Sequence, residues 1–100
     1  MKVYVVYGYE YDEVFCDEVF DTFDKALKFI SDDFSGFITE SVEYGTLDPE
    51  IAAVVLLRLV VWVGRMHIAK PSDDNIYFEY IDPDDSDTGI TYRIAELEIK

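Results

Sequence analysis

The segment Ile51–Val63 restricts the fold of this chain more than any other part of the sequence, because all of its residues except Arg58 are apolar. Asp48-Pro49-Glu50 precedes it and combines an N-cap acid, a proline at the first helical position and an acid in the first turn. This combination is a helix-start signal. We therefore predict a helix from Pro49 to about Val63 that ends at Gly64.

A helix that is apolar on every side must also be covered on every side. Two arrangements meet this requirement: the helix is central in the domain, or one of its faces closes a symmetric dimer. The apolar segment is too short to span a bilayer, which needs about 20 residues, so no membrane contact is expected. The candidate residues for a dimer contact are Arg58, Trp62, Met66 and His67.

The first part of the chain predicts two strands followed by a helix. Val3–Tyr9 and Val14–Phe20 are rich in valine and aromatic residues, which is typical of strands. Thr22 is a suitable N-cap, and apolar residues then recur at three- and four-residue steps. This spacing predicts an amphipathic helix over Phe23–Asp33, and we expect Ser35-Gly36 to end it.

The weak alternation of Phe37–Tyr44 predicts a third strand, with Ile38, Val42 and Tyr44 on one side, and we expect Gly45 to end it.

A hairpin is expected near the C-terminus. Its strands are Ile76–Ile81 and Ile90–Ile99, and the turn-forming residues of Asp82–Gly89 connect them. The predicted order is β-β-α-β-α-β-β. This order indicates a single α+β domain over residues 1–100, with a mainly antiparallel sheet of about five strands and two helices.

The acidic residues are strongly segregated. The chain has 22 Asp and Glu against 8 Lys and Arg, a formal net charge of -14. All but two of the acids fall in three stretches that contain no Lys or Arg: Val3–Asp24, Phe29–Leu57 and Pro71–Tyr92. Such a charge repels itself and destabilises the compact state. Halophilic adaptation, a surplus for solubility, or a surface that meets a basic partner would each account for it.

This charge argues against direct binding of nucleic acid, which needs clustered Lys and Arg for the phosphates. It favours a basic partner, in particular a nucleic-acid-binding protein. Acids two apart on a strand lie roughly 6.6 Å apart on one face and form rows of negative charge. The tyrosines that could add aromatic anchors are Tyr4, Tyr7, Tyr9, Tyr11, Tyr77 and Tyr80, although at least half are expected to pack on the sheet. The candidate partner-binding acids are Glu10, Asp12, Glu13, Asp17, Glu18, Asp21, Asp73, Asp74, Asp82, Asp84, Asp85 and Asp87.

Catalytic motifs are missing from the sequence, so we expect no enzyme and no cofactor. Cys16 and His67 are the only cysteine and histidine, and neither lies in a nucleophile motif. Cys16 alternates with Val14, which indicates a small buried apolar residue. One cysteine excludes an intramolecular disulfide and fits a reducing cytoplasm.

No metal site is expected either. Zinc requires a cluster of cysteine and histidine residues. The acidic loop fails the EF-hand pattern in both registers: counting from Asp85 puts Gly89 one position early, and counting from Asp84 puts Ala95 where a glutamate is required.

Lys2–Val6, followed by Glu18–Ala26, resembles a recurrent opening of small phage and bacterial proteins. In those proteins two strands lead into a helix through a V-F-(S/D/T)-x-x-(E/D)-K-A junction. The size, the acidity and the lack of a cysteine framework are similar to phage-encoded anti-CRISPR and anti-restriction proteins that mimic DNA. This second likeness is one of type, without a shared motif.

The leading hypothesis is an inhibitor encoded by a phage or a mobile element. It would act in the host cytoplasm and occupy the nucleic-acid site of a basic defence protein. The alternatives are an immunity protein or antitoxin that neutralises a basic nuclease, and a non-catalytic oligomerising module with surplus surface charge.

Overall fold

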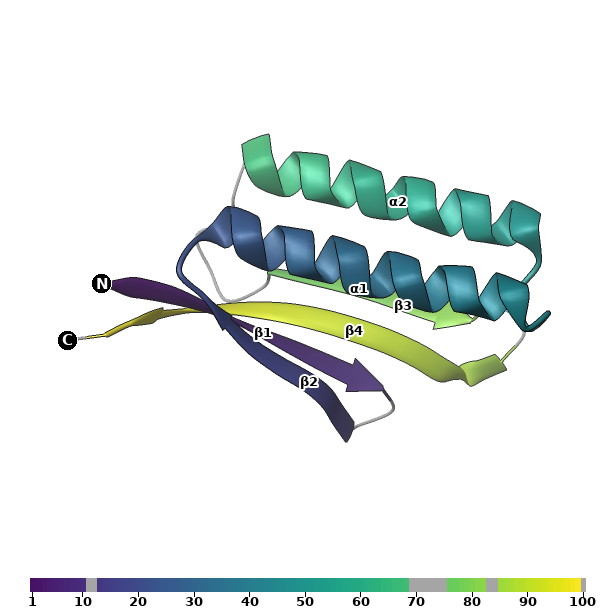
Figure 1. Ribbon diagram of the computed structural model, residues 1–100, viewed down its shortest axis with the longest axis horizontal. Helices are drawn as coiled ribbons and strands as arrows, with labels where there is room; N and C mark the ends of the chain where they lie inside the picture. The colour runs from purple at the N-terminus through teal and green to yellow at the C-terminus, as the bar shows by residue number, and fades with distance from the viewer. Residues whose placement is uncertain (11–12, 69–75, 83–84, 100) are drawn as a thin grey trace. The chain divides into compact units, whose positions relative to one another are not determined.

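The computed structural model describes residues 1–10, 13–68, 76–82 and 85–99. The α+β class, with two helices and an antiparallel sheet, is confirmed (Figure 1). The chain divides into two compact units, one formed by Met1–Ala26 with Pro71–Lys100 and the other by Leu27–Lys70. The elements in chain order are β1 (Lys2–Glu10), β2 (Glu13–Phe20), α1 (Phe23–Glu43), α2 (Pro49–Ile68), β3 (Ile76–Asp82) and β4 (Asp85–Glu98).

Within the described residues, the sheet has four antiparallel strands in the order β2-β1-β4-β3. β1 pairs with β4 along its whole length, from Lys2 opposite Glu98 to Glu10 opposite Ile90. The first and last strands of the sequence are therefore neighbours at the centre of the sheet. β4 begins earlier than expected, at Asp85, because this residue pairs with Asp82 of β3.

The two faces of the sheet differ in burial. Residues directly opposite one another share a face, and on one face they are the buried Val6, Ile94 and Ile76 and the buried Tyr92 and Phe78. Most side chains on the other face are partly or fully exposed. Val3, Val5 and Ala95 also lie on this second side, where Val3 and Val5 are buried. We call its partly or fully exposed part the open face, which comprises Tyr7, Tyr9, Val14, Asp17, Val19, Tyr77, Glu79, Thr91, Arg93 and Leu97.

A bulge interrupts the pairing of β1 with β2. Tyr9 pairs with Val14 and Gly8 pairs with Cys16, which leaves Phe15 as an extra residue on β2. An extra residue reverses the alternation of a strand beyond that point. Simple alternation along the sequence of β2 does not anticipate this bulge.

Helix α1 begins as predicted and ends later. The backbone amide of Lys25 donates to Thr22 Oγ1 at 3.2 Å, which confirms the N-cap. The helix does not stop at Ser35-Gly36, so the predicted strand Phe37–Tyr44 is wrong and the sheet has four strands instead of five. A glycine within a helix costs only about 1 kcal/mol relative to alanine. Burial of a side chain such as that of Ile38 contributes about 1.5–3 kcal/mol and outweighs it.

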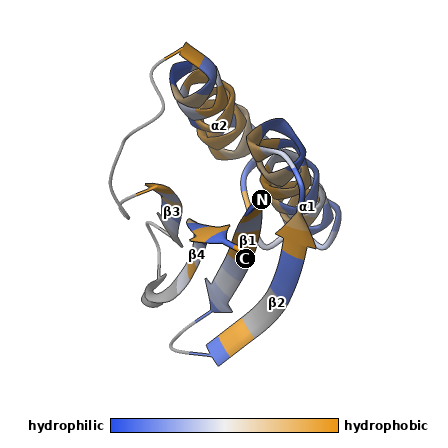
Figure 2. Cartoon of the chain, turned by 90° about the vertical axis from the view of Figure 1, so that its left-hand side faces the viewer, coloured by the Kyte–Doolittle hydropathy of each residue, from blue (hydrophilic) through white to orange (hydrophobic). Residues whose placement is uncertain are grey.

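Glycine and aspartate define the connection between the helices. Gly45 adopts a φ of 75°, a left-handed conformation that favours glycine, and its amide donates to the Val42 carbonyl at 3.1 Å. The amide of Glu50 donates to Asp48 Oδ1 at 2.8 Å, which confirms the predicted helix start at Asp48. The predicted break at Gly45 is also present, but the element that ends there is helix α1 and not the predicted strand. α1 and α2 lie side by side in both views (Figure 1, Figure 2).

Helix α2 passes through Gly64 and ends at Ile68, so the predicted end near Val63 is wrong. The backbone at Gly64 does not take a positive φ, unlike that at Gly45, and Arg65 and Met66 are good helix formers. The segment Ile51–Val63 is helical throughout.

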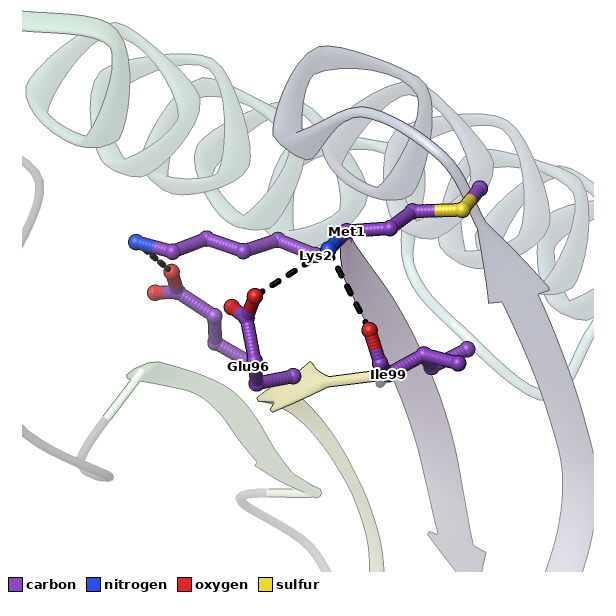
Figure 3. A network of polar contacts seen from close by, with 5 residues as sticks. Met1, Lys2, Glu96 and Ile99 are labelled. Carbon is purple, nitrogen blue, oxygen red and sulfur yellow. Dashed lines mark hydrogen bonds and ion pairs between the residues drawn. The ribbon is translucent and has the colours of Figure 1, made fainter.

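The two chain ends are fastened together at one end of the sheet (Figure 3). The Met1 ammonium lies 3.1 Å from Glu98 Oε1 and donates to the Ile99 carbonyl at 3.2 Å. Lys2 Nζ lies 3.0 Å from Glu96 Oε1. This hydrogen bond and the charge of Glu96 raise the pKa of Lys2 above its usual value.

Candidate functional site

The ends of the β1–β2 and β3–β4 hairpins lie at the same end of the sheet, opposite the chain termini (Figure 1). Glu10 and Glu13 form the last pair of the β1–β2 ladder. The Asp82–Asp85 pair ends the β3–β4 ladder, and β4 links the two hairpins because Glu10 pairs with its Ile90. The tertiary structure therefore gathers two groups of predicted acids that are far apart in the sequence.

The edge strand β2 carries a second set of predicted acids. Glu13, Asp17 and Glu18 are all exposed. Asp17 pairs with Tyr7 of the open face, whereas Glu18 pairs with the buried Val6. Asp17 and Glu18 therefore lie on opposite faces of the edge strand, as the alternation of side chains along a strand requires.

Asp21 differs from the other predicted acids because a cation partly neutralises it. Its Oδ1 lies 2.9 Å from Lys25 Nζ. The hydrogen bond from Lys25 and the lysine's charge lower the pKa of Asp21 below its usual value. Asp21 therefore presents less net negative charge to a partner than Asp17 or Glu18.

We expect the stability that this ion pair provides to have a defined pH window. Because the pKa of Asp21 is lowered in the folded chain, the contribution is complete above the unfolded value of 3.8 and is lost as pH falls through the folded value. An NMR titration of the Asp21 carboxyl checks the shift. In Lys25→Met the pKa should return to its usual value, and an unchanged value would show that Lys25 is not its cause.

A row of polar and aromatic residues crosses all four strands on the open face. The pairings Asp17–Tyr7, Tyr7–Arg93 and Arg93–Tyr77 place these four residues side by side from one edge to the other. Tyr9 adds a ring 6.4 Å from that of Tyr7. Arg93 was not predicted, because only the pairing of β1 with β4 shows that it lies among these tyrosines.

The tyrosines of the sheet differ in burial according to the face on which they lie. Tyr4 packs edge-on against Phe23, with ring centroids 5.7 Å apart, and Tyr80 is buried. Tyr7, Tyr9 and Tyr77 lie on the open face, partly or largely exposed. These three are available as aromatic anchors for a partner.

Several predicted positions lie outside the described residues: Asp12, Asp73, Asp74, Asp84 and Tyr11. The backbones of Asp82, Asp85 and Asp87 are in β3 and β4, and nothing is described of their side chains.

Helix α2 is long and apolar enough to cross a membrane, by length and composition alone. It has 20 residues and a mean hydropathy of 1.9, and much of it has the orange of hydrophobic residues in Figure 2. The apolar segment Ile51–Val63 is too short by itself, but the helix extends beyond it, so the length of that segment does not exclude a crossing. A single crossing at α2 would nevertheless put β1 and β4 on opposite sides of the bilayer. Their hydrogen-bonded pairing excludes that arrangement in this fold.

The predicted dimer contacts lie on different sides of α2. Trp62 and Met66 continue the side of the buried Val55 and Leu59 at three- and four-residue steps and are themselves half-buried. Arg58 is exposed on the flank of the helix, between that side and the opposite one. His67 is exposed in the last turn.

No group of three His, Cys, Asp or Glu side chains among the described residues could hold a metal ion. The side chain of Cys16, which was predicted to be buried, lies outside those described. The candidate site is therefore the open face together with the acids of β2.

Comparison of the chain with protein-family models, with curated proteins and with solved structures finds no match.

Proposed function

We propose that this chain is a non-catalytic inhibitor that binds a basic, nucleic-acid-binding protein and occupies its nucleic-acid site. In this proposal it is an anti-defence protein of a phage or mobile element and acts in the host cytoplasm. The observation that carries the proposal is the open face, where tyrosines continue into the acidic edge strand β2.

Each part of this surface has a physical role in the proposed complex. Asp17 and Glu18 offer carboxylates where a basic groove would otherwise bind phosphates. Tyr7 and Tyr77 offer large, rigid contact areas of the kind enriched at interfaces. The net charge of -14 would steer a basic partner to the surface and make association fast and dependent on salt.

Acids on an edge strand also prevent sheets from joining edge to edge. Protection of the edge would explain the exposed acids of β2 without any partner, so the test must separate this explanation from the proposed function. The two explanations differ in what neutralisation of β2 does: loss of partner binding in one case, self-association through the edge in the other.

The test uses two variants that remove equal charge from different surfaces. The first is Glu13→Gln/Asp17→Asn/Glu18→Gln on β2, and the control is Asp32→Asn/Glu40→Gln/Glu43→Gln on exposed positions of α1. The immobilised chain captures basic proteins from host lysate at low salt. Each captured protein is then purified and assayed for competition between this chain and duplex DNA.

We expect the chain to displace DNA from the captured protein and the affinity to fall as salt rises. The β2 variant should bind about 10-fold more weakly, since each exposed ion pair contributes about 0.2–1 kcal/mol, and the α1 control should change little. Affinity independent of salt, or simultaneous binding of DNA and this chain, would contradict the proposal. Equal losses in both variants would show that overall charge, and not this surface, determines binding.

A further inference from the structure

Helix α2 exposes an apolar stripe that nothing described in the chain covers. Val54, Leu57, Val61 and Ile68 are each more than half exposed. Their spacing of three, four and seven residues places them on one side of the helix, opposite the buried Ala52, Val55 and Leu59. Large exposed apolar patches mark interaction sites, so we call these four residues the α2 stripe and ask what binds it.

The charge around the α2 stripe selects the partner. From Ile51 to Ile68 the chain has no acid and has two exposed arginines, Arg58 and Arg65. Glu50, also exposed, lies at the opposite end of the same side of the helix. A basic partner would meet no acids along the stripe. A second copy in the antiparallel direction would bring the acidic end of one helix to the basic end of the other.

We propose that two copies of this chain associate through antiparallel α2 stripes. One register satisfies both charge and packing, because Glu50 and Arg65 are equally distant from the midpoint between Leu57 and Arg58. Val54 and Val61 are also equally distant from it. Glu50 therefore lies opposite Arg65 of the second copy, Val54 opposite Val61, and the two Leu57 side chains meet at the centre. Antiparallel helices also align their dipoles favourably.

The same register brings the two Arg58 residues near the twofold axis, on the flank of the contact. Two like charges there oppose association, as does the net charge of -14 on each copy. Salt screens such repulsion, with a Debye length of about 10 Å at 0.1 M. Self-association through the α2 stripe should therefore strengthen with salt. The proposed partner binding should weaken, so the two proposals stand or fall separately.

The contact is small, since a 20-residue helix is about 30 Å long and about 10 Å wide. A standard interface buries about 800 Å² per partner. We therefore expect a reversible dimer with a dissociation constant on the order of micromolar or weaker.

The first test places a charge in the contact and measures sedimentation equilibrium over a range of concentrations at 0.05 and 0.5 M NaCl. Leu57→Glu should raise the dissociation constant at least about 100-fold, because both copies lose the burial of a leucine. Val60→Glu is the matched control: Val60 and Leu57 are 64% and 63% exposed, but Val60 lies on the flank of the helix. Circular dichroism verifies that both variants remain folded.

The second test fixes the direction by oxidative cross-linking in a Cys16→Ser background. Leu57→Cys should form a covalent dimer, and so should Val54→Cys/Val61→Cys. Val61→Cys alone should not, because its two copies would be separated by roughly 10 Å along the helix axis. Covalent dimers of Val61→Cys alone would indicate a parallel pair and overturn the antiparallel proposal.

A protein that stays monomeric at millimolar concentration in 0.5 M NaCl would overturn the proposal altogether. A dimer that Val60→Glu disrupts as strongly as Leu57→Glu would place the contact elsewhere. A monomer whose α2 stripe is instead protected by another protein would identify a different occupant and also refute self-association.

Discussion

Replacement of Val6 by Asp is expected to remove a large part of the protein's free energy of unfolding at neutral pH. Val6 is fully buried at the centre of the sheet, between Glu18 on β2 and Ile94 on β4. An uncompensated charge in such a site costs about 3–5 kcal/mol, and the neighbouring carboxylate of Glu18 adds repulsion. Domains of this size are stable by only about 5–15 kcal/mol. Urea denaturation followed by circular dichroism measures the loss.

The matched control for this variant is Val19→Asp. Val19 is also a strand valine, but it is 61% exposed on the open face. The same substitution there should change the free energy of unfolding by no more than about 0.5 kcal/mol. Equal destabilisation by both variants would show that the two faces are not distinguished by burial, which would remove the basis of the candidate site.

Replacement of Ile38 by Ala is expected to destabilise the protein by about 2–5 kcal/mol, as for other fully buried aliphatic side chains. In α1, Ile38 is 0% exposed and Tyr44, just past the helix, is 80% exposed. A strand over Phe37–Tyr44 would instead place both side chains on the same side. Tyr44→Ala is therefore expected to change stability by no more than about 0.5 kcal/mol. Thermal unfolding of the two variants distinguishes a helix from a strand.

Similar losses in both variants would support the strand. A small loss in Ile38→Ala would show that this part of α1 contributes little to the core. The expected inequality follows from the periodicity of the helix, in which residues six apart lie on different sides of the helix.

Local sequence signals predicted the element starts well, because those signals act within a few residues. The hydroxyl of Thr22 and the carboxylate of Asp48 each bind an amide in the next turn, and Gly45 provides the positive φ that few other residues adopt. The valine and tyrosine content of β1 likewise sufficed to predict a strand. None of these features depends on distant parts of the chain.

Local signals did not show that α1 continues through Gly36 and α2 through Gly64. A glycine weakens a helix by about 1 kcal/mol, and whether that ends the helix depends on what the following residues bury. Ile38 is buried, and a strand pattern over so short a stretch could not reveal it. For the same reason the sequence did not predict the full length of α2, and only that full length is sufficient to cross a membrane.

Composition alone established the acidity of the chain and its segregation from the basic residues. The tertiary structure decided which of these acids lie together, because the β1–β4 pairing brings two distant hairpins to one end of the sheet. It also placed Arg93 beside Tyr7 and Tyr77. Strand register determines which side chains are neighbours, and register arises from contacts between residues far apart in the chain.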